Sequence, residues 1–466
     1  MGATQSIAYW ITETKLADIP AEAKKTAEIG CFDCLGVMLA ACTQGHGKLF
    51  NRYVEDIGGK PEATVIPSGF RTSASNAALA NGTFSHALDY DDSGAFAHAS
   101  TVLFPALVAL GEKIGVSGSD LVEAYVVGFE VGVRLASPYK QSRGFHKMAV
   151  FGRMAAAAAC SKLLQLNAQQ VQMALGIAGS MASGVVLNHG TMTKPLHAGL
   201  AARDGVMAAE LASRGWTAAE DIIDHPLGFI PSFCGDAGDV DDIVKKLGNP
   251  YTIQNTIVIK KYPCGAGNHP TIDSLLALME EHGFGYRDVE ELELQQSYQS
   301  DYVLYAKPRT GLEGKFSVLY NAAAALVQGK VDIDTFSDDR IKDTRIQDTM
   351  NKIRIRILTR WDEWEEKSGG RWPAGSTGFT GKPVKVRLTD GRVLVKTIAP
   401  KELLGSPRNP WGMENIRAKF ESNARLVLTE DRVQQAARLW SSLGEIKDVR
   451  NAVKDLLIGE ADAQNT

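Results

Sequence analysis

The sequence predicts a two-domain protein, in which a large all-α helical bundle is joined to a smaller α+β domain. In the first half of the chain, apolar residues recur at helical spacing and alanine and glycine are frequent. After about Tyr251, β-branched segments and glycine-rich turns replace that pattern. The chain has 466 residues, 44% of them hydrophobic, which is enough for two or three domains.

The helices of the first half carry recognisable start signals. Ser117 and Asp120 form a capping-box pattern before a run of apolar residues at helical spacing. Asn167 and Gln170 predict the start of another helix, and Pro195 predicts the first position of a third. The alanines on the inward faces of these helices indicate a tightly packed bundle.

The α+β region is expected to contain strands at 256–259 and 352–358, a helix at 271–282 and a hairpin over 384–398. The hairpin is predicted from the Asp-Gly turn that ends at Gly391.

The domain boundaries follow from these changes of pattern. We expect residues 1–262 to form the helical domain and 263–404 the α+β domain. After a Gly/Pro-rich break, residues 405–466 are expected to return to the helical domain as helices.

Composition and motifs exclude several functions. The net charge is −4 and no long basic block occurs, so a nucleic-acid partner is not expected. The longest apolar run, 101–111, is too short to span a membrane, and the start of the chain does not resemble a secretory signal. Cys31 and Cys34 form a CxxC in an apolar helical stretch, which favours core packing over zinc binding. We therefore expect a soluble cytoplasmic protein.

No metal-binding or nucleotide-binding motif is found, and Gly265-Ala-Gly267 lacks the third glycine of a dinucleotide site. Neither a metal nor a cofactor is expected, so side chains must carry any chemistry.

Acidic and imidazole side chains form the first group of candidates. Asp89, Asp91 and Asp92 place three carboxylates directly before Ser93, and His98 follows shortly after. A carboxylate beside an imidazole can act as a general base with its orienting group, although a solvated acidic loop has the same pattern. His146 lies on a loop before a helix, where a structural role is the alternative.

Lysines form the second group. Lys194 lies at the start of the Pro195 helix, whose positive end favours an anion and lowers the pKa of a lysine; the alternative is a lysine in solvent. Lys260 and Lys261 end a predicted strand and form another candidate carboxylate site, with His269 nearby. Tyr320 lies on a helical face that is typical of a core phenol.

Several motifs, in order along nearly the whole chain, resemble the MmgE/PrpD family. The quoted segments are LDYDD at 88–92 with His98, GFH at 144–146, GTMTKPLHAG at 190–199, YPC at 262–264 with HPTID at 269–273, and KFS at 315–317. The resemblance implies a helical domain, a smaller α+β domain covering a cleft between the two, a homodimer and no cofactor. It also implies small polycarboxylic acids as substrates and a carbanion next to a carboxylate.

The match to one member, cis-aconitate decarboxylase, implies a set of site residues: Asp89, Ser93, His98, His146, Lys194, Lys260 and Tyr320. That enzyme has a histidine where this chain has Gly265 and a threonine where it has Ser93. The missing imidazole argues against decarboxylation, and the overall pattern is most similar to iminodisuccinate epimerase.

The resulting hypothesis is a cofactor-independent epimerase of a small polycarboxylic or imino acid. His98, oriented by Asp89, would act on one face of the substrate, and His146 or Tyr320 on the other. The alternatives are a dehydratase of the 2-methylcitrate type, a decarboxylase of a tricarboxylic acid, or a polyacid-binding protein without turnover.

Overall fold

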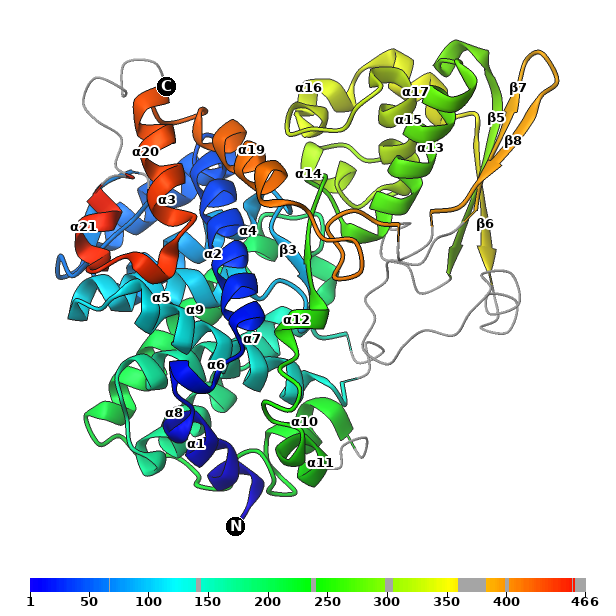
Figure 1. Ribbon diagram of the computed structural model, residues 1–466. Coiled ribbons are helices and arrows are strands. Elements are labelled where there is room, and N and C mark those ends of the chain that lie inside the picture. Colours follow the sequence, from blue (N-terminus) through cyan, green and yellow to red (C-terminus); the bar gives the residue numbers. More distant parts are fainter. Residues whose placement is uncertain are drawn as a thin grey trace.

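The computed structural model describes residues 1–66, 68–139, 144–235, 240–297, 305–358, 383–398, 402–454 and 456. It shows a larger helical domain beside a smaller domain of helices and one sheet (Figure 1), which confirms the predicted fold class. Each domain has its own hydrophobic core. One core takes residues up to Ile259 and again from Ile416 onward, and the other takes residues from Tyr262 to Leu388.

The larger domain is built mainly from helices. Their bounds are α1 (Ala3–Glu13), α2 (Ala21–Ala41), α3 (Gly45–Ile57), α4 (Ala74–Ala87), α5 (Ser100–Ile114), α6 (Gly118–Ala136), α7 (Lys147–Leu163), α8 (Ala168–Met181), α9 (Thr193–Ser213), α10 (Phe229–Cys234), α11 (Val240–Lys245) and α12 (Ile253–Thr256). Small residues allow close contact at the centre. A Cβ atom at Gly82 of α4 would lie 2.9 Å from the Cα atom of Gly199 in α9, so these two helices touch through their backbones.

The predicted helix starts are confirmed at two of three places. Ser117 and Asp120 form a reciprocal capping box at α6, and Asn167 and Gln170 form one at α8. The third helix, α9, begins at Thr193 and not at Pro195. Its first turn therefore includes the lysine that precedes the proline.

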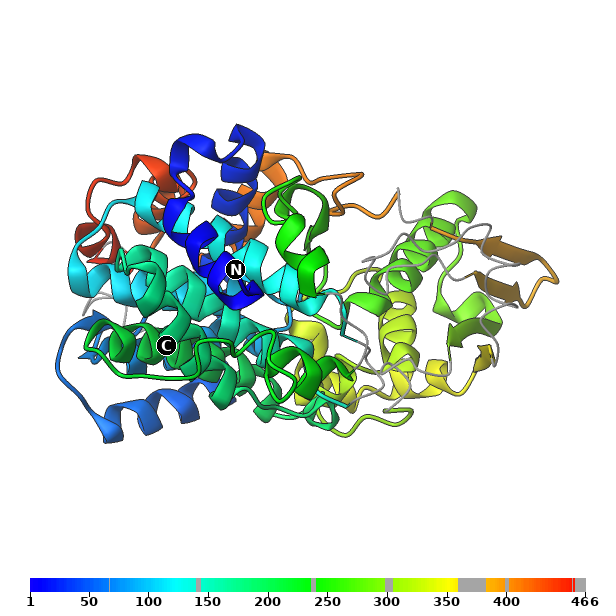
Figure 2. The ribbon, with the colours of Figure 1, turned by 90° about the horizontal axis from the view of Figure 1, so that it is seen from below.

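The smaller domain has a four-stranded sheet in the order β6-β5-β7-β8. The strands are β5 (Val289–Ser297), β6 (Ile353–Leu358), β7 (Val384–Leu388) and β8 (Val393–Lys396). Strand β5 pairs parallel with β6 and antiparallel with β7, and β7 and β8 form the predicted hairpin. The helices are α13 (His269–His282), α14 (Gly311–Gly314), α15 (Val318–Gln328), α16 (Asp338–Ile341) and α17 (Thr344–Met350); α13 and α15 lie beside the sheet (Figures 1 and 2).

Two further pairs of short strands lie outside this sheet. Strands β1 (Ala63–Thr64) and β2 (Arg71–Thr72) pair with each other, as do β3 (Asp92–Gly94) and β4 (Ile257–Ile259). The strand predicted near 256–259 is therefore present, but it belongs with its partner to the larger domain, because Ile257 and Ile259 are buried in that domain's core.

The last helices pack on the larger domain: α19 (Met413–Ala424), α20 (Glu430–Trp440) and α21 (Val449–Lys454). Phe420 of α19 stacks on Phe32 of α2, with ring centroids 4.3 Å apart. Next to this stack, the Lys419 ammonium lies 2.7 Å from the buried carboxylate of Asp33 and donates to the Tyr90 and Lys260 carbonyls. Helix α19 thereby supports two segments of the candidate site from behind.

Among the described residues, no single helix is long and apolar enough to cross a membrane; α2 and α3 pass that test only as a pair bent by 91°. All six cysteines are free thiols, and Cys31 and Cys34 are buried in α2, as the core-packing interpretation predicts.

Candidate active site

A short strand pair brings the acidic segment and Lys260 together. Asp92 in β3 pairs with Ile259 in β4, so Lys260 follows directly beside the turn that precedes β3. In that turn Asp89 has a φ of 52°, a left-handed conformation that few non-glycine residues adopt. This backbone turns the Asp89 side chain toward the lysines.

Asp89 forms a buried ion pair with two lysines. Its Oδ1 atom accepts from Lys194 Nζ at 2.7 Å and from Lys260 Nζ at 2.9 Å, and all three side chains are at most 5% exposed. Burial alone would raise the pKa of Asp89, but the two ammonium charges hold that pKa well below its ordinary value. Asp89 is therefore an anion that fixes the positions of both cations.

The orienting carboxylate of His98 is Asp91, and the prediction that Asp89 has this role is wrong. Asp91 Oδ2 lies 2.6 Å from His98 Nδ1, and Asp91 Oδ1 lies 2.9 Å from His86 Nδ1. An ionised carboxylate only accepts, so both rings carry their proton on Nδ1. His86 Nε2 is then free to accept from Lys194 at 2.8 Å. His98 Nε2 is unprotonated and lies 3.9 Å from Asp89 Oδ1, beyond hydrogen-bond distance.

His146 joins a second group of imidazoles. Its ring centroid lies 4.8 Å from that of His189, 5.2 Å from that of His197 and 6.5 Å from that of His98. Burial lowers the pKa of His146 well below its ordinary value, and the charge of Lys194 adds to this effect. His146 therefore lies close to His98, with the two rings in a T-shaped arrangement.

Lys194 lies where its sequence pattern predicts, in the first turn of α9, and it is buried. Its pKa is lowered, as expected. The largest cause, however, is burial, with the charge of Lys260 adding to it and the charge of Asp89 opposing it.

The smaller domain closes over this cluster. The Lys194 ammonium lies 5.0 Å above the ring of Phe316, and the Tyr305 hydroxyl donates to the His189 carbonyl at 2.7 Å. Lys315 donates to the carbonyls of Leu88 at 2.8 Å and of Pro263 at 2.7 Å. The cluster therefore lies where the two domains meet.

Lys315 was not among the predicted site residues, although it begins the KFS motif. It is buried, and burial lowers its pKa to about 7 although the Asp89 carboxylate opposes the shift. His86 and Asp91 were also missed as individual residues. Asp91 could have been found from the acidic run at 88–92, while only the fold reveals His86.

Three other predicted residues lie at the edge of the cluster or outside it. Ser93 is buried in β3 opposite Val258. Lys261 forms an ion pair with Asp273 at 2.8 Å and is partly exposed. His269 is buried beside Tyr262; burial, with the charge of Lys260, lowers its pKa to about 3.

Tyr320 was expected to be a proton donor at the cluster, but its hydroxyl lies elsewhere. Its hydroxyl donates to the Thr335 carbonyl at 2.5 Å, and its ring belongs to the core of the smaller domain. This placement does not agree with a proton donor at the cluster. Cys264 is also unsuited to chemistry, because burial raises the pKa of its thiol to about 12.

Four side chains of the cluster have the chemistry of metal ligands: His86, Asp89, Asp91 and His98 offer atoms within 4.8 Å of one another. The Lys194 ammonium, however, already bonds to His86 and Asp89. A cation of the protein itself thus neutralises these donors, and the residues fit a metal poorly.

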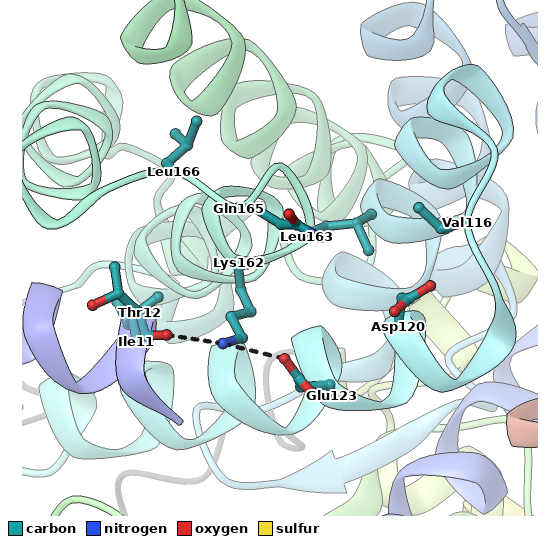
Figure 3. Close-up of a pocket in the computed structure, with 9 residues that line it drawn as sticks. All are labelled: Ile11, Thr12, Val116, Asp120, Glu123, Lys162, Leu163, Gln165 and Leu166. Carbon is teal, nitrogen blue, oxygen red and sulfur yellow. Dashed lines mark hydrogen bonds and ion pairs between the residues drawn. The ribbon is translucent and has the colours of Figure 1, made fainter. Parts of the chain in front are cut away.

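A separate pocket of about 370 Å³ opens between α1, α6 and α7 (Figure 3). Its one lysine, Lys162, pairs with Glu123 at 3.1 Å and donates to the Thr12 carbonyl. None of the predicted site residues lines this pocket.

The electrostatics of the cluster favour an anionic ligand. Lys194 and Lys260 lie against the carboxylates of Asp89 and Asp91, and Lys315, whose pKa is lowered to about 7, adds part of a third positive charge, while burial keeps the imidazoles neutral. Asp92 adds little negative charge, because burial and the neighbouring Asp91 raise its pKa to about 8. The arrangement can bind carboxylates and move protons beside them.

The fold and the cluster together define a class of protein. A helical domain meets a smaller α+β domain, and lysine, imidazole and carboxylate side chains that can do acid–base chemistry are buried where the two domains meet. The chain belongs to the MmgE/PrpD family: the MmgE/PrpD N-terminal domain matches residues 5–239 and the MmgE/PrpD C-terminal domain matches residues 262–443.

Several curated proteins are similar over most of the chain. A cis-aconitate decarboxylase-like protein, oryM, of Aspergillus oryzae is 27% identical over 98% of this chain and 97% of its own length. The cis-aconitate decarboxylase of Mus musculus is 28% identical over 81% of this chain and 78% of its own. The enzyme of that name from Aspergillus terreus is 26% identical over 96% and 94%, respectively.

Proposed function

We propose that this protein is an enzyme that transfers a proton at the carbon next to a carboxylate of a small polycarboxylic acid. The observation that carries the proposal is the Asp91–His98 pair, which presents an unprotonated Nε2 beside the buried ammonium groups of Lys194 and Lys260. A base beside cations is the combination that carbanion formation next to a carboxylate requires.

The geometry supports a division of roles. Lys194 and Lys260 would bind the substrate carboxylates, and their charges would stabilise the enolate-like anion as it develops. His98 Nε2 would remove the proton, and Asp91 would stabilise the imidazolium that results. His146, whose ring centroid lies 6.5 Å from that of His98, would deliver a proton to the carbanion.

Within this class, epimerisation of iminodisuccinate is the first candidate. An epimerase needs one group on each face of the carbon, and two imidazoles with ring centroids 6.5 Å apart suit that requirement. Gly265, whose N–H donates to the Lys315 carbonyl at 3.0 Å, adds no third acid or base where cis-aconitate decarboxylase has a histidine.

Decarboxylation of a tricarboxylic acid is the second candidate, and the names of the similar curated proteins favour it. Loss of carbon dioxide leaves the same kind of carbanion, which one imidazole then protonates. Dehydration of a 2-hydroxy polyacid would use the same base.

We also propose that the active form is a homodimer, which light scattering on the purified protein would test.

The experiment that separates these reactions is proton NMR in D2O with iminodisuccinate, cis-aconitate and 2-methylcitrate as parallel substrates. Deuterium at the carbon next to the carboxylate, with inversion and without an alkene, would support the epimerase. Carbon dioxide release would support the decarboxylase, and a new alkene the dehydratase. The His98→Asn variant serves as the control, because it should abolish the deuterium exchange and the dehydration, the two changes that begin with removal of a proton. Binding of all three compounds without exchange or turnover would contradict the proposal and favour a polyacid-binding protein.

A further inference from the structure

His197 is a buried residue for which the proposed reaction has no direct use. It lies in α9, one turn beyond Lys194, and its Nδ1 atom lies 2.9 Å from His146 Nδ1. Both side chains are buried, at 5% and 4% exposure. Gly184 lies beside both residues: its carbonyl accepts from the His146 backbone N–H at 3.0 Å, and a Cβ atom there would lie 3.5 Å from the His197 ring.

Both rings are neutral near pH 7. Burial lowers the pKa of His197 to about 4, and the charges of Arg153, His189 and Lys194 add to the shift. Arg153 is a fixed cation in this environment, because Asp204 pairs with it at 2.6 Å. Burial, His189 and Lys194 likewise lower the pKa of His146.

Two neutral imidazoles that share a hydrogen bond between their Nδ1 atoms must be opposite tautomers. The ring that donates carries its proton on Nδ1 and leaves Nε2 bare, while the ring that accepts carries its proton on Nε2. The state of His197 therefore determines whether His146 presents a base or an acid at Nε2.

We infer that His197 is a positioning residue that donates its Nδ1 proton to His146 and so keeps His146 in the Nε2–H form, ready to protonate the carbanion. The inference rests on the proposed function, in which His98 is the base because Asp91 holds its proton on Nδ1. An acid is then needed on the other side, and a neutral imidazole provides one only through Nε2–H.

The proton count balances over a turnover. The substrate carbon loses a proton to His98 Nε2 and receives one from His146 Nε2. His146 is left briefly as an imidazolate beside Lys194, and transfer of the His197 Nδ1 proton to His146 Nδ1 passes that negative charge to His197, near the Arg153 cation. The proton that His98 holds returns to this pair through solvent after product release, so no other reactant is needed.

The direct test is nitrogen-15 NMR of the full-length protein labelled at histidine, because protonated and bare ring nitrogens give well-separated signals. The His146→Asn and His197→Asn variants assign the two rings. We expect a protonated Nε2 and a bare Nδ1 for His146, and the reverse for His197. A protonated Nδ1 on His146 would overturn the inference whether or not any substrate is turned over.

Kinetics give a second test. His197→Leu removes the donor and should lower kcat by roughly 10–100-fold with little change in KM. His197→Asn keeps an N–H donor near Nδ1 and should recover much of that loss. Exchange of the substrate proton with D2O, which His98 carries out, should survive in both variants. The exposed His225 provides the matched control, since His225→Asn should change nothing. Equal activity of His197→Leu and the wild type would contradict the inference, whereas loss of exchange in the wild type would contradict the proposed function itself.

Discussion

The Asp91 carboxylate lies 2.6 Å from His98 Nδ1, and this contact determines which nitrogen of the ring is available as a base. Asp91 is fully buried, and the two imidazoles beside it keep its pKa well below the ordinary value although burial opposes that shift. It therefore stays an anion when His98 gains a proton. The geometry makes Asp91 the electrostatic partner of the proposed base.

Replacement of this carboxylate should impair the chemical step more than binding. In Asp91→Asn the amide can donate to His98 Nδ1 and so favour the wrong tautomer, and we expect kcat to fall by roughly 10²–10⁴-fold with a small change in KM. Steady-state kinetics on the substrate identified by NMR measure this. Asp92→Asn is the matched control, because Asp92 is equally buried but its Oδ1 accepts from the Ser100 N–H and not from an imidazole. A fall confined to KM would be inconsistent with the role given to Asp91.

Lys260 should matter for substrate affinity. Its ammonium is 1% exposed and lies 2.9 Å from both the Asp89 carboxylate and the Asp89 carbonyl. Loss of one charge-assisted contact to a substrate carboxylate costs about 1.5–3 kcal/mol, so Lys260→Met should raise KM by roughly 10–100-fold.

The neighbouring lysine provides the comparison for this variant. Lys261 pairs with Asp273 and is partly exposed, so Lys261→Met should leave KM within about twofold of the wild type. If the two variants raised KM equally, a general effect of positive charge would replace the specific role of Lys260.

Local signals in the sequence predicted much of the fold. The capping boxes at Ser117 and Asn167 are correct because a cap depends on residues three positions apart. Strand β5 was not predicted, although Val289, Leu292 and Leu294 are buried in it. Its pairing with β6 joins segments about sixty residues apart, which no local pattern reveals.

The sequence predicted many of the residues that lie in the candidate site, but it did not predict which carboxylate contacts which partner. The left-handed turn at Asp89 sends that carboxylate to the lysines and leaves Asp91 to the imidazoles. Three carboxylates within four positions give no sign of this division, because it depends on the backbone conformation of the turn. His86 joins the site only because the end of α4 faces α9.

Asp92 should make stability depend on pH. Its folded pKa is about 8, against an ordinary value of 3.8, because burial and Asp91 disfavour the charged form. The unfolded chain therefore releases this proton first, and the wild type loses stability as the pH rises from about 4 to 8. Asp92→Asn removes the titration, so its free energy of unfolding relative to the wild type should increase across that range. Urea unfolding at pH 5 and pH 8 measures the difference, and a value for the variant minus the wild type that stays constant or decreases from pH 5 to pH 8 would refute the assignment.

A variant of Tyr320 can separate two roles for its hydroxyl: the proton donor that the sequence analysis expected, and the structural hydrogen bond that its contacts support. Its hydroxyl donates to the Thr335 carbonyl and its ring packs near Phe336, with centroids 6.0 Å apart. Tyr320→Phe removes one buried hydrogen bond and should lower the free energy of unfolding by about 1 kcal/mol. Because the hydroxyl is bonded inside the smaller domain, we expect kcat and KM to stay within about twofold of the wild type. Urea unfolding and steady-state kinetics on the same preparation make the comparison. A large fall in kcat with unchanged stability would restore the phenol as a proton donor and would require the smaller domain to rearrange when substrate binds.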